Sequence, residues 1–399
     1  MSTFKIHELK QLPDVIINSD LVATLIDTYS DNDNTTIDKQ IYYFNETGIL
    51  DINQLIKCFH TIRYFGIDIT NEMAMQYIDS ILNISNRDDL ISEYPEFRDI
   101  WMVVELIDKL PNNQLCVEFA KIGSIFGLYY AHNKNYSWYV NKPEKFRFLG
   151  DEMLIMDKQY ACDVASEFGH LNCLTFAYEH GCPFNDAAKN ASKAGHIECL
   201  QYVFKNGGSI HNVAYYAAKH GNLDCFRFAI ENGCEMPQRI FIETAAYGHL
   251  NCLKYMHEHN LTNNYIHNSK SYDSVTYCAA INGQINCLKY LHEQNYIGDE
   301  LACEGAAEYG HINCLSFLHD QNYAWDINTC INAAFNGHIN CLKYAHENGC
   351  PWNEDVALAA ASNGHINCLK YAHENGCPWN ENVVLAAAEY GHINCLKYA

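Results

Sequence analysis

The stretch from Gly337 to Asn353 reads Gly-His-Ile-Asn-Cys-Leu-Lys-Tyr-Ala-His-Glu-Asn-Gly-Cys-Pro-Trp-Asn, and it returns without change from Gly364 to Asn380. The same phrase begins a third time at Gly391. Self-similarity at a fixed period is the signature of a repeat protein, in which each unit packs only on its neighbours. The period therefore decides the fold class before any single residue is interpreted.

The first glycine of this phrase marks a frame that recurs through most of the chain. Successive frame glycines are 26, 26, 27, 35, 27, 27, 27 and 27 residues apart. The nine frame glycines are Gly169, Gly195, Gly221, Gly248, Gly283, Gly310, Gly337, Gly364 and Gly391. A degenerate copy around Gly123 keeps Leu, Tyr, Ala, His and Trp at their offsets. The sequence thus predicts about ten repeats of 26 to 27 residues.

Each repeat predicts two helices. Residues 355–363 are rich in Ala and other good helix formers, begin with an Asp that can cap free amides, and lead into Gly364, which suits a left-handed helix end. Residues 365–375 then place apolar side chains at helical spacing with polar ones opposite. The predicted fold class is all-α, an α-solenoid of helix-turn-helix repeats.

The repeated phrase resembles the second half of an ankyrin repeat, with Cys and Leu where that family usually has two valines. Ankyrin repeats have a period of about 33 residues, so these units are shortened, and the missing residues fall where the family carries a projecting β-hairpin. The family's Thr-Pro-Leu-His signature is also absent. The repeats are rich in Asn, Ile and Tyr, and in this they are most similar to the ankyrin proteins of giant, mimivirus-like DNA viruses that infect amoebae and to those of the hosts of these viruses.

The sequence divides into an N-terminal domain at 1–111 and a repeat array at 112–399. Two insertions interrupt the array, near 139–157 and 261–272, and are expected to form loops on one face of the stack. Because each 26- or 27-residue step lacks the residues to build a hairpin, we expect no sheet between Asn112 and Ala399.

The first 110 residues have no repeat glycine, and we expect a small, mainly helical domain there. Residues 52–67 form an amphipathic pattern that ends in Arg63-Tyr-Phe-Gly-Ile67, and a second helical pattern follows near 72–82. This ending is similar to the back half of a BTB/POZ or related cullin-adaptor fold. The alternative is an unassigned helical cap on the array.

Composition narrows the class of partner. The formal net charge is -22, so the chain lacks the basic footprint of a nucleic-acid or acidic-membrane binder. No signal-like start and no long apolar run is seen, and we expect a cytoplasmic protein, in the host cytoplasm if the chain is viral. The 19 cysteines are then expected to be reduced.

A cysteine follows every frame glycine by four residues, as Cys341 follows Gly337. Equivalent positions on stacked helices lie about 8–10 Å apart, too far for one tetrahedral zinc ion or for a disulfide. We therefore expect buried, reduced, metal-free thiols. Trp325, Trp352 and Trp379 exchange with Ile and Met at their offset, which favours core positions. The histidine after the glycine is expected to start the second helix and hydrogen-bond between repeats.

No phosphate loop, dinucleotide fingerprint, nucleophile elbow or His-Glu-x-x-His motif is present. We therefore expect no enzyme and no cofactor. The predicted function is a non-enzymatic scaffold that binds a protein partner, such as a host protein. The alternative is a substrate-recruiting adaptor that binds a cullin-type ubiquitin ligase component through the N-terminal domain.

In ankyrin-like stacks the residues just before the frame glycine end the first helix on the concave side, and here they vary between repeats. Aromatic side chains there suit interface anchors. The predicted partner-binding residues are Phe168, Lys193, Lys219, Tyr247, Glu308, Tyr309, Phe335, Glu389 and Tyr390.

Overall fold

A computed structural model of the chain describes residues 3–5, 36–38, 71–83, 97–148, 151–236, 239–261, 274–296 and 300–399. The segment from residue 52 to residue 67, which carries the resemblance to BTB/POZ, lies outside these residues. So does almost all of the insertion predicted near 261–272.

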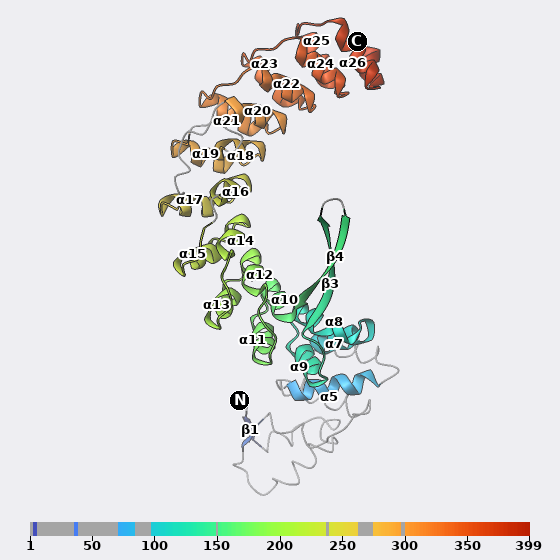
Figure 1. The fold of residues 1–399 in the computed structure, drawn as a ribbon, viewed down its shortest axis with the longest axis vertical. Helices are drawn as coiled ribbons and strands as arrows, with labels where there is room; N and C mark the ends of the chain where they lie inside the picture. Colours follow the sequence, from blue (N-terminus) through green and yellow to red (C-terminus); the bar gives the residue numbers. More distant parts are fainter. Residues whose placement is uncertain are drawn as a thin grey trace. The chain divides into compact units, whose positions relative to one another are not determined.

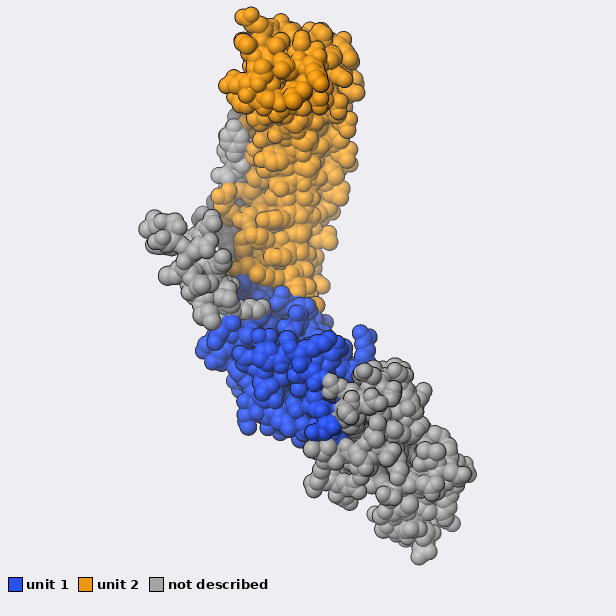
Figure 2. Space-filling view, turned by 90° about the vertical axis from the view of Figure 1, so that its right-hand side faces the viewer, with its two compact units in different colours: residues 1–191, 198–209 blue, residues 192–197, 210–399 orange. Residues whose placement is uncertain are grey.

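The chain forms two compact units, which are coloured separately in Figure 2. Unit 1 comprises 1–191 and 198–209, and unit 2 comprises 192–197 and 210–399. Neither unit ends at residue 111, and the division of the chain at that point stays a prediction.

Unit 1 begins with a short antiparallel pair, β1 (Thr3–Lys5) and β2 (Thr36–Asp38), followed by α5 (Asn71–Leu82) and α7 (Arg98–Lys109). Three helix pairs follow. They are α8 (Asn112–Ile122) with α9 (Ile125–Asn133), α10 (Ala161–Phe168) with α11 (Leu171–Glu179), and α12 (Ala187–Ala194) with α13 (Ile197–Lys205). The last three residues of α12 and the first residue of α13 belong to unit 2.

Unit 2 contains seven further pairs within its described residues. They are α14 (Val213–Lys219) with α15 (Leu223–Glu231), α16 (Ile240–Ala246) with α17 (Leu250–Glu258), α18 (Val275–Ile281) with α19 (Ile285–Glu293), α20 (Glu300–Glu308) with α21 (Ile312–Asp320), α22 (Ile327–Phe335) with α23 (Ile339–Glu347), α24 (Glu354–Ser362) with α25 (Ile366–Glu374), and α26 (Glu381–Glu389) with α27 (Ile393–Tyr398).

The pairs stack in two layers. First helices contact first helices, as α20 contacts α22 and α22 contacts α24, and second helices contact second helices in the same way. In unit 2 the first helices follow the inner side of the curve and the second helices its outer side (Figure 1). The prediction of an all-α solenoid with two helices per frame is confirmed.

Small side chains form the seam between the layers. In one repeat Ala333 and Ala334 of α22 and Cys341 and Leu342 of α23 are almost completely buried. Short side chains let neighbouring helices approach closely, and each thiol acts as a small apolar group. The predicted burial of the frame cysteines is confirmed for all nine. Burial raises the pKa of the Cys341 thiol to about 12, so it stays protonated at neutral pH.

Three first helices of unit 2 begin at an Asn or Asp that ends the preceding connection. The side chain of Asn353 accepts a hydrogen bond from the Asp355 amide, and Asp326 and Asn380 cap α22 and α26 in the same way. The expectation that Asp355 is the cap is wrong by two residues, because α24 already includes Glu354 and Asp355 in its first turn.

The frame glycine and the histidine of the next repeat form one contact. Gly337 has a φ of 79°, and a Cβ placed on it would lie 2.5 Å from Nδ1 of His365. In four repeats the ring Nε2 donates to a carbonyl near the end of the preceding first helix, for example from His311 to Ile281 O at 3.0 Å and from His392 to Ser362 O at 3.0 Å. These carbonyls lack a partner within their own helix. The predicted hydrogen bonding between repeats is confirmed.

Replacing Gly337 by Ala tests this contact, and Gly349→Ala is the matched control. Both glycines have positive φ, but nothing lies within 4 Å of a Cβ at Gly349. The control should cost about 1–2 kcal/mol of unfolding free energy from the left-handed backbone alone. Gly337→Ala should cost about 1–3 kcal/mol more, because the His365 ring must move. Urea denaturation of both variants measures the difference, and equal losses would contradict the contact.

The second helices carry a ladder of aromatic rings on their outer side. His346 stacks on Trp352 with ring centroids 3.7 Å apart, and Trp352 meets Tyr371 of the next repeat edge-on at 6.3 Å. The same arrangement recurs at His319, Trp325 and Tyr344. The three tryptophans are therefore half-buried. The prediction that they are core residues is wrong, because the connection holds them against the outer layer rather than between the layers.

The insertion after α9 forms a hairpin, which contradicts the expectation of no sheet after Asn112. Strands β3 (Tyr139–Phe148) and β4 (Asp151–Tyr160) pair antiparallel from Tyr139 with Tyr160 to Phe148 with Asp151. Twenty residues outside the repeat frame are enough to form two strands whose backbone N–H and C=O groups hydrogen-bond to each other. Its base is anchored, since the Ala161 amide donates to Trp138 O at 2.8 Å and the strands contact α8 and α10.

Asp163 of α10 is a buried carboxylic acid with a structural role. It is 2% exposed, and its Oδ1 accepts the Asn185 and Asp186 amides at 3.1 and 2.9 Å. Burial raises the pKa of Asp163 from 3.8 to about 6, although backbone hydrogen bonds from Asn185, Asp186 and Tyr160 oppose the shift. Between these two values the folded chain binds more protons than the unfolded chain. The free energy of unfolding therefore falls as the pH rises through this window.

Asp163→Asn should remove this pH dependence, because an amide oxygen can still accept both bonds but carries no charge. Relative to the unsubstituted chain, the variant should gain up to about 3 kcal/mol between pH 4 and pH 7. Denaturation at several pH values measures the gain, with the exposed Glu179→Gln as control. A stability difference that does not change with pH would refute the shift.

Candidate protein-binding surface

Four predicted aromatic residues lie at the carboxyl ends of first helices in unit 2. Phe335 is the last residue of α22, and the other three directly follow α16, α20 and α26. All four are largely exposed: Tyr247 by 51%, Tyr309 by 53%, Phe335 by 49% and Tyr390 by 61%. We call these four the inner aromatic row.

The helical rotation explains why these positions face solvent. In α20, Ala306 and Ala307 are buried in the seam, and Tyr309 follows about 200° further round the helix axis from Ala307. Gly310 then turns the chain away with a φ of 78°. Each ring is therefore presented beside a backbone turn, and in the three repeats of Tyr247, Tyr309 and Phe335 a side chain of the next repeat lies against that turn.

Lys219 connects the row to neighbouring tyrosines. Its Nζ lies 3.1 Å from Tyr215 Oη, 5.4 Å from the centroid of the Tyr247 ring and 4.0 Å from Glu243 Oε2. The hydrogen bond to Tyr215 is the main reason that the pKa of Lys219 is raised. The structure thus brings Lys219 and Tyr247 together on adjacent first helices, α14 and α16.

Lys193 belongs to a similar contact, with its Nζ 4.9 Å from the centroid of the Tyr216 ring. Glu308 is half-buried, and Glu389 is exposed. The predicted set therefore does not form one cluster. It forms a row of aromatic rings and, beside it, lysine–tyrosine contacts that link α12, α14 and the end of α16.

The sequence prediction missed Tyr215, Tyr216 and Glu243. Tyr215 precedes Lys219 by four residues on one helix, a spacing that brings side chains together. That spacing was a usable signal. Glu243 approaches from the next helix, which no local spacing could reveal.

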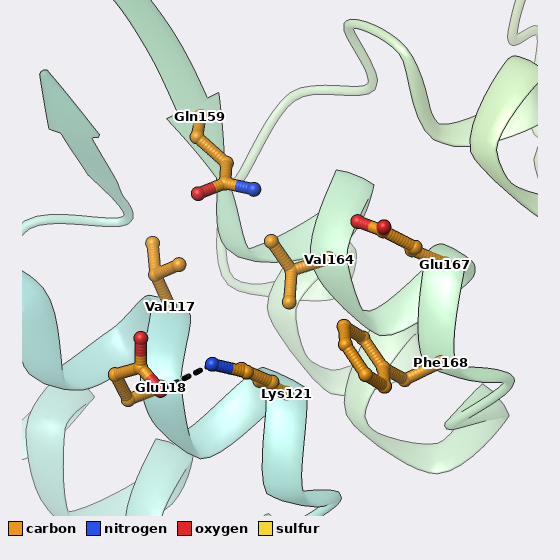
Figure 3. A pocket seen from close by; sticks show the side chains of 7 residues that line it. All are labelled: Val117, Glu118, Lys121, Gln159, Val164, Glu167 and Phe168. Atoms are coloured by element: carbon orange, nitrogen blue, oxygen red, sulfur yellow. Dashed lines mark hydrogen bonds and ion pairs between the residues drawn. The ribbon is translucent and has the colours of Figure 1, made fainter. Parts of the chain in front are cut away.

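Phe168, the remaining predicted aromatic residue, lies in unit 1 and is 44% exposed. It lines a pocket of about 160 Å³ together with Val117, Glu118 and Lys121 of α8, Gln159 of β4, and Val164 and Glu167 of α10 (Figure 3). The sequence placed Phe168 on a binding surface, but the pocket depends on the hairpin that the sequence prediction excluded.

Other kinds of site are not indicated in the part of the chain that the structure describes. No group of three or more His, Cys, Asp or Glu residues is arranged there to hold a metal ion. Among the described helices, none has both the length and the apolar character needed to cross a bilayer.

The comparison with protein families agrees with the repeat architecture. Residues 214–303 match the family model for ankyrin repeats in three copies. No curated protein sequence matches the chain. The human ASB11 ankyrin repeat domain is a similar solved structure, with 17% identity, a TM-score of 0.35, and 42% of this chain and 85% of that chain covered. A likeness at this TM-score supports no statement about function.

The fold and the family match define a class: a helical solenoid whose residues 214–303 match ankyrin repeats, which indicate a scaffold for protein–protein interaction. Such a scaffold is typically non-enzymatic. The resemblances to viral ankyrin proteins and to BTB/POZ stay predictions.

The inner aromatic row should contribute little to stability. Because the rings are about half exposed, Tyr309→Ala and Phe335→Ala should each change the free energy of unfolding by no more than about 0.5 kcal/mol. Leu315→Ala in the adjacent second helix, where Leu315 is completely buried, should cost about 2–5 kcal/mol. Chemical denaturation of the three variants makes the comparison. A loss at Tyr309 close to that at Leu315 would identify the ring as a packing residue.

Proposed function

We propose that the first-helix face of unit 2 binds a protein partner through the inner aromatic row. The observation that carries this proposal is the exposure of four large rings at the carboxyl ends of first helices whose buried seam is built largely from small side chains. Rigid aromatic side chains bury much area on binding and lose little conformational entropy. They are therefore suited to act as anchors.

A protein fits this surface better than a small molecule does. The four rings are spread over α16, α20, α22 and α26, so they offer separate contact points along the stack rather than one enclosed cavity. Small-molecule sites are concave and bury most of their ligand. A row of this kind instead matches an extended segment or a folded surface.

Charge supports a neutral or basic partner. The chain carries a net charge of -22, which would repel an acidic partner and attract a basic one. Lys219 is the local exception, but its ammonium is already engaged by Tyr215 and lies near Glu243. We infer that the tyrosines, rather than the lysine charge, form the contact there.

The adaptor alternative requires a cullin-type partner for the N-terminal domain. Most of residues 1–110 lie outside the described residues, and no described contact favours this function over simple binding.

Site-specific crosslinking tests the proposed face. The photoreactive residue p-benzoylphenylalanine is placed at Tyr309 or at Phe335 in the full chain, and a crosslinked protein is identified in the cell extract. The matched control is Phe317 of α21, an aromatic residue of the same repeat as Tyr309 on the second-helix layer. One partner should be captured from the inner positions and not from Phe317.

Alanine variants then measure the contribution of the row to that partner's affinity. Tyr247→Ala, Tyr309→Ala and Phe335→Ala should each weaken binding by about 2 kcal/mol, while Phe317→Ala should have little effect. Capture only from Phe317, or unchanged affinity in all three variants, would be incompatible with the proposal.

A further inference from the structure

The pocket beside Phe168 is built by two stacked first helices and by the hairpin, which the repeat frame alone would not supply. Val117, Glu118 and Lys121 lie on α8, Val164, Glu167 and Phe168 on α10, and Gln159 at the end of β4. Figure 3 shows the Gln159 amide and the Phe168 ring on opposite sides of the space between α8 and α10. The hairpin thus closes one side of a gap between two stacked first helices.

The size of the pocket suits a single side chain. Its volume of about 160 Å³ is well below the roughly 300–1,000 Å³ of typical small-molecule sites. Val117 and Val164 are almost completely buried and form an apolar floor, while Phe168 offers an accessible ring. An aliphatic stem therefore has apolar surface to cover.

The charges around the pocket are mainly negative. Lys121 is the cation among the seven lining residues, and its Nζ lies 3.3 Å from Glu118 Oε2. Glu167 is exposed and makes no ion pair with any described residue. With Lys121 balanced by Glu118, a cationic head group would find the Glu167 carboxylate available.

We propose that this pocket binds an arginine side chain of the protein partner. The stem lies on Val117 and Val164, the guanidinium stacks on Phe168, and its N–H groups donate to Glu167 and to the Gln159 carbonyl oxygen. A guanidinium is favoured over a lysine ammonium because its plane can stack on the ring while its edge donates to two acceptors.

This inference rests on the proposed function, since it assumes a protein partner, but it uses a different surface. The pocket lies in unit 1, and the inner aromatic row lies in unit 2. Variants of the two surfaces can therefore be compared in one assay.

A peptide library is the probe for the pocket. Random 12-residue peptides displayed on phage are selected on the immobilised full chain, and enriched sequences are synthesised with each fixed arginine or with citrulline in its place. Citrulline keeps the planar shape and removes the charge. Replacing arginine by citrulline should weaken binding at least about tenfold, as expected when a hydrogen-bonded charge is removed.

Protein variants assign the arginine to this pocket. Glu167→Gln should weaken the arginine peptide about tenfold and leave the citrulline peptide almost unchanged. Phe168→Leu, which keeps an apolar wall without the ring, should weaken the arginine peptide several-fold. Glu179→Gln on the second helix α11 is the control for a lost carboxylate, and melting curves verify that all variants fold.

Several results would overturn the assignment: no enriched arginine at any position, a fixed lysine instead, or equal losses for both peptides on Glu167→Gln. Binding that is lost in Tyr309→Ala but unaffected by Glu167→Gln would refute the pocket and leave the proposed function intact. Arginine peptides that depend on Glu167 and are unaffected by Tyr309→Ala would support the pocket, and the crosslinking assay then decides the row separately.

Discussion

The contact between a frame glycine and the first side chain of the next second helix is the constraint on which the array depends. That side chain is an imidazole at Gly221, Gly283, Gly310, Gly337 and Gly364, and an amide at Gly195 and Gly248. The glycine has a left-handed backbone conformation and no side chain. The ring of the next histidine can therefore lie directly against its Cα, as His365 does against Gly337. From that position the ring can donate to the last carbonyls of the preceding first helix, as His392 does to Ser362. One side chain thus fixes the spacing of two repeats and satisfies a helix end that stacking would otherwise leave without a partner.

The same constraint creates the candidate binding surface. Because the glycine ends the first helix and the next repeat holds the turn, the residue just before the glycine is presented to solvent in a defined orientation. It can change from repeat to repeat without disturbing the seam of Ala and Cys side chains behind it. Tyr247, Tyr309 and Tyr390 occupy this position in otherwise similar repeats. Binding specificity can therefore change from repeat to repeat while the packing of the repeats stays the same.

The hairpin shows a second way of adding function to a repeat frame. It enters between α9 and α10, where a connection can lengthen without breaking either helix layer. Its base supplies Gln159 to the pocket that α8 and α10 line with Phe168 and Glu167. A stack of helices alone would leave this gap open, and the strands turn it into a site of the size of one side chain.

The sequence by itself determined the repeat fold, the two helices per frame, the burial of cysteines such as Cys341, and the exposure of the inner aromatic row. All of these follow from local periodicity, which acts within one repeat and its neighbour. Only the tertiary structure decided the pairing of β3 with β4, the placement of Trp352 on the outer layer, and the meeting of Glu243 with Lys219 and of Phe168 with Gln159. Some of these contacts involve the inserted hairpin, which is not part of the repeat, and the others join side chains of different repeats. No pattern within a single repeat encodes either kind of contact.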